Sequence, residues 1–125
     1  MKKEIVGGVG MPATLYLEEF GMHLWHTFGK PAYRVGSSMT SKQWRDVDVR
    51  LILDDDEYEK MGLGDPDHPH SNPKWVALTL AFSELGRKLT GLPIDFQIQQ
   101  QSQANRLFPG RRAALGCSKM VKDSR

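Results

Sequence analysis

Two aspartates separated by a single residue are the first candidates for chemistry in this 125-residue chain. Asp46 and Asp48 open a stretch, residues 46–53, in which polar and apolar side chains alternate. Because successive side chains of a β-strand point to opposite faces, the alternation predicts a strand with an apolar face and a face that carries both carboxylates. Aspartate is disfavoured in strands, so two on one face need a reason. Carboxylates that act together with substrate phosphates are typical ligands of Mg²⁺.

A third aspartate stands in a similar setting further along the chain. Asp95 lies within residues 93–98, where Ile94, Phe96 and Ile98 share one parity and Asp95 and Gln97 occupy the other. This pattern predicts another strand with one apolar face. If the two strands are neighbours in one sheet, Asp95 joins Asp46 and Asp48. We therefore expect three carboxylates around one metal site.

A glycine-serine turn that precedes the aspartate pair is a candidate phosphate-binding element. Tyr33 and Val35 indicate a short strand that ends at Gly36. Without a Cβ atom, Gly36 lets a phosphate group approach the backbone closely. The backbone N–H groups and the hydroxyls of Ser37 and Ser38 can then donate hydrogen bonds to phosphate oxygens. The turn is thus a candidate nucleotide-binding element.

The order of these motifs resembles the DNA polymerase β-like nucleotidyltransferase superfamily, and most closely its small, palm-only members, the minimal nucleotidyltransferases. The resemblance covers about residues 12–98. The matching residues are Gly36 and Ser37 in the turn, Asp46 and Asp48 in the metal-binding pair, and Asp95 as the third carboxylate. The chain departs from the pattern at Arg45, where a small polar residue is common, and it lacks the usual glycine a few residues after the serine.

The resemblance implies an enzyme that moves a nucleoside monophosphate from an NTP to an acceptor hydroxyl and releases pyrophosphate. Mg²⁺, or Mn²⁺ in its place, would be held by Asp46, Asp48 and Asp95, and these three residues would be catalytic. Lys42, between the turn and the aspartate pair, would lie beside the nucleotide and meet phosphate; a solvated loop lysine is the equal alternative. The acceptor stays open among a tRNA end, a protein hydroxyl and a small molecule such as an antibiotic.

Two other classes of function remain alternatives. A catalytically degenerate member would keep the fold as a nucleotide-binding or interaction module. A metal-dependent nuclease also uses an acidic triad, although it has little use for a glycine-serine turn.

Two amphipathic helices are expected to support these strands. Residues 12–28 carry apolar side chains at helical spacing and are followed by Gly29, a common helix terminator. The second helix has Asn72 as its N-cap and ends at Gly91. Its expected apolar stripe consists of Trp75, Leu78, Phe82, Leu85 and Leu89. The fold class is α/β of the α+β type, with a small mixed β-sheet and helices packed mainly on one face.

The remaining segments define the expected domain organisation. We expect a single domain with an N-terminal arm (1–11), a palm core (12–98), and a C-terminal extension with a basic tail (99–125). Residues 99–106 have helical potential. Residues 54–70 hold seven acidic side chains and are interpreted as a solvated loop. The net charge of +2 is too small to indicate nucleic-acid binding by itself.

A single cysteine and the absence of a long apolar run give the expected location. One cysteine cannot form an internal disulfide and suits a reducing compartment. The sequence contains no membrane-spanning run and no signal-peptide core. We expect a cytoplasmic protein without a membrane partner.

Overall fold

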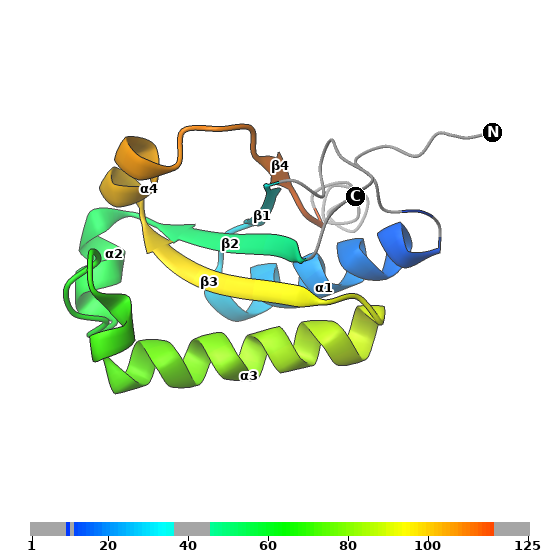
Figure 1. The fold of residues 1–125 in the computed structure, drawn as a ribbon, viewed down its shortest axis with the longest axis horizontal. Coiled ribbons are helices and arrows are strands. Elements are labelled where there is room, and N and C mark those ends of the chain that lie inside the picture. Colours follow the sequence, from blue (N-terminus) through cyan, green and yellow to red (C-terminus); the bar gives the residue numbers. More distant parts are fainter. Residues whose placement is uncertain (1–9, 11, 37–45, 117–125) are drawn as a thin grey trace.

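A four-stranded mixed sheet forms the centre of the fold (Figure 1). The computed structural model describes residues 10, 12–36 and 46–116. The strands are β1 (Ala32–Val35), β2 (Val47–Leu53), β3 (Ile94–Gln100) and β4 (Ala113–Ala114), in the order β3-β2-β1-β4. β2 and β3 run parallel, whereas β1 is antiparallel to both of its neighbours, β2 and β4. The predicted α+β class with a small mixed sheet is confirmed.

Two long helices, α1 (Ala13–Phe28) and α3 (Pro73–Thr90), cover one face of this sheet. The predicted boundaries hold: Gly29 and Gly91 cap the two helices in the left-handed conformation, and the Asn72 side chain accepts a hydrogen bond from the Trp75 N–H at the start of α3. Between the helices and the sheet lies one apolar core. Its fully buried members from α1, β2 and β3 include Leu17, Phe20, Leu24, Val47, Val49, Leu51, Ile94, Phe96 and Ile98.

The predicted stripe on α3 is wrong at one position. Leu85 is 39% exposed and lies outside the core, whereas Gly86 and Ser83 on the same helix are buried. A Cβ atom on Gly86 would lie 2.9 Å from the Phe20 ring, so the close approach of α1 and α3 requires a residue without a side chain there. Backbone proximity, rather than a large apolar side chain, closes this part of the interface.

The acidic segment was predicted as a loop, but it begins with a helix, α2 (Asp55–Lys60). Asp54 and Glu57 form a reciprocal capping box in which each side chain bonds to the other residue's backbone N–H. This arrangement satisfies two donors that a helix N-terminus leaves unpaired. A 3₁₀ turn, η3 (Pro69–Ser71), leads from this region into α3. A further short helix, α4 (Gln101–Leu107), follows β3 directly and bears out the helical potential of that segment.

The outer edge of β3 is closed by side chains from α3. Ser83 Oγ accepts a hydrogen bond from the Phe96 N–H at 2.9 Å and lies 3.4 Å from the Phe96 carbonyl oxygen, to which it donates. Two residues further along, Trp75 Nε1 donates to the Ile98 carbonyl oxygen at 2.9 Å. An edge strand otherwise presents unpaired backbone groups. These contacts satisfy three such groups of β3, namely the Phe96 N–H and the carbonyls of Phe96 and Ile98.

Candidate functional site

Asp48 and Asp95 lie side by side at the start of the two parallel strands. β2 and β3 pair in a register that sets Asp48 opposite Asp95. Both residues have the parity opposite to the buried apolar side chains of their strands. Their carboxylates therefore project from the face of the sheet that α1 and α3 leave open. The structure thus brings Asp95 next to the Asp-x-Asp pair, as the sequence predicted.

A positive charge stands between these two carboxylates. Arg50 Nη2 lies 3.6 Å from Asp48 Oδ1 and 3.5 Å from Asp95 Oδ2. Arg50 Nη1 donates to the Asp95 backbone carbonyl at 2.6 Å, which fixes the guanidinium over β3. The Arg50 side chain is only 12% exposed. Sequence reasoning did not single out this residue, although it lies two positions after Asp48 on the same strand face.

The pKa of Asp48 is raised above its ordinary value. Burial is the main cause because it disfavours the charged carboxylate. The Arg50 guanidinium opposes this effect, while the negative charges of Asp95 and Asp46 add to it. Asp48 is thus a half-buried carboxylate among like charges, which is the environment in which binding a cation is favourable.

Gly36 meets the Asp48 carboxylate directly. Its φ of 83° lies in the left-handed region, which residues with a side chain rarely adopt. A Cβ atom placed on Gly36 would overlap Asp48 Oδ2 and lie 3.2 Å from Asp48 Cγ. Gly36 and the metal-ligand candidate Asp48 therefore touch, and this close approach requires glycine at position 36.

The other predicted site residues are placed only in part. Asp46 is exposed, just before β2, and its charge acts on Asp48. Ser37, Ser38 and Lys42 lie outside the residues that the structure describes, as does Arg45. Within the described ranges, no group of three histidine, cysteine, aspartate or glutamate side chains is arranged to hold a metal ion. Asp48 and Asp95 form a pair rather than a closed triad.

This pair nevertheless fits a magnesium ion in its chemistry. Mg²⁺ is commonly held by one or two carboxylates, with substrate phosphates and water completing its coordination. Asp48 and Asp95 supply hard oxygen donors, and the raised pKa of Asp48 indicates that its negative charge lacks full compensation. The ion and the Arg50 guanidinium would compete for the same oxygens.

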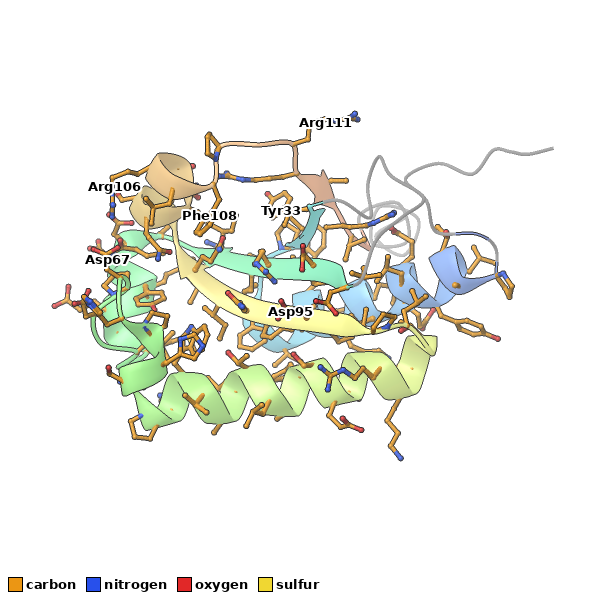
Figure 2. The ribbon with its side chains drawn as sticks, viewed as in Figure 1. Tyr33, Asp67, Asp95, Arg106, Phe108 and Arg111 are labelled. Atoms are coloured by element: carbon orange, nitrogen blue, oxygen red, sulfur yellow. The ribbon has the colours of Figure 1, made fainter. Side chains whose placement is uncertain are left out.

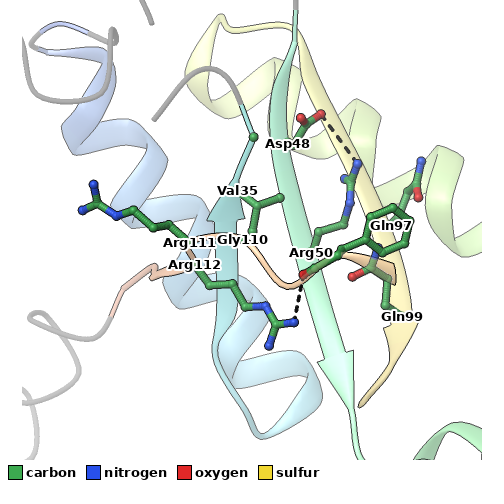
Figure 3. A pocket seen from close by; sticks show the side chains of 10 residues that line it. Val35, Asp48, Arg50, Gln97, Gln99, Gly110, Arg111 and Arg112 are labelled. Atoms are coloured by element: carbon green, nitrogen blue, oxygen red, sulfur yellow. Dashed lines mark hydrogen bonds and ion pairs between the residues drawn. The ribbon is translucent and has the colours of Figure 1, made fainter. Parts of the chain in front are cut away.

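A pocket of about 750 Å³ extends from Gly36 and Asp48 along the open face of the sheet (Figure 3). Arg50, Gln97 and Gln99 line its floor from β2 and β3. Val35 from β1 also lines it. The volume is within the range of small-molecule sites in proteins.

The opposite wall of the pocket comes from residues 108–112, which we call the C-terminal wall. Phe108, Gly110, Arg111 and Arg112 line the pocket from this segment. Figure 2 shows Phe108 after α4, where the chain turns back over the sheet toward β4, and Arg111 pointing away from the molecule. Sequence reasoning placed this stretch in an extension and gave it no part in the site.

The C-terminal wall is anchored beyond its end to β1 and α1. The Leu115 N–H donates to the Ala32 carbonyl at 2.9 Å, and the Gly116 N–H donates to Glu18 Oε1 at 2.7 Å. A Cβ atom on Gly21 would lie 2.8 Å from the Leu115 carbonyl carbon, so this part of the chain packs tightly against α1. The short strand β4 precedes this anchor, which explains how a two-residue strand persists.

Comparison with known proteins gives no assignment. No family model, no curated protein and no solved structure matches the chain. Along the described ranges, every helix is too short or too polar to cross a lipid bilayer.

Proposed function

We propose that this protein is a nucleotidyltransferase that uses Mg²⁺ to move a nucleoside monophosphate from an NTP to an acceptor hydroxyl. The observation that supports this proposal most strongly is the contact between Gly36 and the Asp48 carboxylate, next to Asp95. Gly36, the described residue of the predicted phosphate-binding turn, and Asp48 both line one end of the pocket, and Asp95 pairs with Asp48. The chemistry requires this combination, because a Mg²⁺–triphosphate needs both a backbone cradle and anionic ligands.

Each residue of the proposed site has a separate role. The glycine at position 36 lets the Asp48 carboxylate lie against the backbone of the turn. Asp46 and Asp48, with Asp95 beside Asp48, would hold Mg²⁺, which supplies charge neutralisation and lowers the pKa of the acceptor hydroxyl. Asp95 would accept the hydroxyl proton. The acceptor oxygen then forms a bond to the α-phosphorus, the bond to the bridging oxygen breaks, and pyrophosphate leaves. Arg50 lies between the Asp48 and Asp95 carboxylates and pairs with both.

A metal-dependent nuclease and a non-catalytic nucleotide-binding module are the competing functions. A nuclease needs carboxylates and water but no turn fitted to a triphosphate. The contact that gives Gly36 its constraint therefore favours the transferase. A non-catalytic module would keep the contact between Gly36 and Asp48 but would not need a carboxylate at position 95.

The test uses the full chain with NTPs labelled at the α-phosphate, Mg²⁺ and a cell extract. We expect label to be transferred to an acceptor. The Asp95→Asn variant should bind Mg²⁺–NTP nearly as well as the wild type and transfer at least about 100-fold more slowly, because it loses an interaction made only in the transition state. Asp48→Asn should lose Mg²⁺-dependent NTP binding itself.

The matched control is Asp56→Asn, an exposed carboxylate on α2, which should change neither binding nor transfer. Transfer by Asp95→Asn at the wild-type rate would exclude Asp95 from the reaction. Metal-dependent cleavage of nucleic acid without NTP would favour the nuclease. NTP binding without transfer to anything in the extract would favour the non-catalytic module.

A further inference from the structure

The far end of the pocket contains a side-chain amide that has no partner among the described residues. Gln99 lines the pocket and is only 7% exposed. No hydrogen bond joins its side chain to any residue in the described part of the chain, although its neighbour Gln97 Nε2 lies 3.5 Å from Asp95 Oδ1. The amide atoms of Gln99 are not among the fully buried unpaired polar atoms of the described ranges, so they stay open to the pocket. An unpaired donor and acceptor that face a pocket are therefore available to a ligand.

An exposed aromatic ring stands on the other side of the same pocket. Phe108 lines the pocket and is 53% exposed, so its ring presents a large apolar area at the surface. Its carbonyl oxygen accepts a hydrogen bond from Arg112 Nη2 at 3.1 Å, and Arg112 Nη1 also donates to Asn105 Oδ1 at 3.2 Å. These bonds hold the C-terminal wall over the floor. An exposed ring of this kind is suited to stack on a flat ligand.

The Gln99 end of the pocket lies some way along β3 from the carboxylates. Asp95 and Gln99 are four positions apart on β3, which corresponds to roughly 13 Å. A nucleotide with its phosphates at Gly36 and Asp48 would have its ribose and base extending in this direction. The free amide and the exposed ring then lie where the base would be.

We propose that Gln99 and Phe108 form the subsite for the base of the donor nucleotide, and that this base is adenine. The inference rests on the proposed function. A glutamine amide pairs with the adjacent donor and acceptor of adenine, whereas arginine is the usual reader of guanine. Arg50 and Arg112 are already engaged by neighbouring groups, and Arg111 points away from the sheet (Figure 2). The Gln99 amide has no protein partner in the described part of the chain, so it is free to pair with a base.

The experiment is calorimetry with the full chain. The probes are Mg²⁺–ATP, Mg²⁺–GTP, Mg²⁺–CTP, Mg²⁺–tripolyphosphate and adenosine alone. We expect the wild type to bind ATP about tenfold or more tightly than GTP or CTP, the scale of one good amide–base pair. Gln99→Leu and Phe108→Ala should each weaken ATP and adenosine binding about tenfold or more and leave tripolyphosphate binding unchanged. Gln100→Leu is the matched control because Gln100 lines a different pocket and should have no effect.

The outcomes separate the base subsite from the proposed function. Equal affinity for ATP, GTP and tripolyphosphate, unaffected by Gln99→Leu, would overturn the subsite and leave the transferase proposal standing. Adenosine binding that is lost in Gln99→Leu, without any binding of Mg²⁺–tripolyphosphate, would support the subsite and count against the transferase. GTP or CTP bound more tightly than ATP would overturn the choice of adenine. If no probe binds the wild type, both proposals fail.

Discussion

Gly36 is constrained twice, by its own backbone angle and by the carboxylate next to it. The first constraint is shared by other glycines, since Gly62 has a φ of 74°. The second is specific, because Gly62 has no atom within 4 Å of the position a Cβ would take, whereas Asp48 fills that space at Gly36. Comparison of the two positions therefore separates backbone strain from the geometry of the site.

Replacement of each glycine by alanine tests this distinction. Both Gly36→Ala and Gly62→Ala should lower the free energy of unfolding by about 1–2 kcal/mol, the strain of a left-handed residue with a Cβ. Only Gly36→Ala displaces the Asp48 carboxylate, so it alone should weaken Mg²⁺–NTP binding, by about tenfold or more. Thermal melts and calorimetry measure the two effects. Unchanged affinity in Gly36→Ala would reduce position 36 to a bend.

Arg50 gives the carboxylate pair a dependence on pH. Burial raises the pKa of Asp48 and Arg50 opposes this rise, so Arg50→Met should raise the pKa further. A carboxyl group with a raised folded pKa destabilises the protein above that pKa, and protonation removes the cost as the pH falls. The variant should lose about 1–3 kcal/mol of stability at pH 7. The loss should shrink as the pH falls toward 3.8, the ordinary aspartate value.

Thermal melts over this pH range test Arg50→Met, with Arg106→Met as the control. Arg106 pairs with Asp67 at 3.2 Å on the exposed surface, where an ion pair contributes little. Added Mg²⁺ should stabilise Arg50→Met more than the wild type, because the guanidinium no longer competes for the carboxylates. A stability loss that is the same at every pH would mean that Arg50 acts only by packing.

At the scale of elements, α3 supports the site strand through its polar residues as well as its apolar ones. Ser83 pairs with both backbone groups of Phe96, the residue after Asp95. Four residues earlier on the same helix, Thr79 Oγ1 is buried without a hydrogen-bond partner in the described structure. The helix thus carries one hydroxyl that contributes to β3 and one that does not.

These two hydroxyls form a matched pair for mutation. Ser83→Ala leaves the Phe96 N–H buried and unpaired, and should lower the free energy of unfolding by about 1–3 kcal/mol. Thr79→Val removes a buried hydroxyl that makes no bond, so it should leave stability unchanged or raise it. Denaturant unfolding of both variants measures the difference. Equal effects would show that Ser83 does not hold the edge of β3.

At the scale of the whole molecule, local patterns predicted the elements and the pairing of two carboxylates. Alternation located β2 and β3, and capping residues located α1 and α3 because such signals lie within a few neighbouring residues. The same kind of signal is present at α2, where Asp54 and Glu57 have capping-box spacing. The acidic segment was nevertheless predicted to be a loop. Leu85 fitted the spacing of its helix, yet the close approach at Gly86 decided which side is buried.

The missing parts of the site depend on contacts between distant segments. Nothing local to residues 108–112 indicates that they form a wall of the pocket, since this follows from the anchor of Leu115 and Gly116 on β1 and α1. Nor does the sequence around Arg50 show that β3 places Asp95 within reach of its guanidinium. Such contacts arise from packing, which sequence periodicity does not encode.

Under the proposed function, the residues for chemistry and the residues for selectivity lie on separate parts of the chain. The carboxylates belong to strands that also build the core, so changes near them are felt throughout the fold. Residues 108–112 are exposed or half-buried and lie between two fixed points, α4 and the anchor on α1. Under the proposed function, substitutions at these five positions should change which molecule the pocket accepts and leave the proposed metal-binding residues in place.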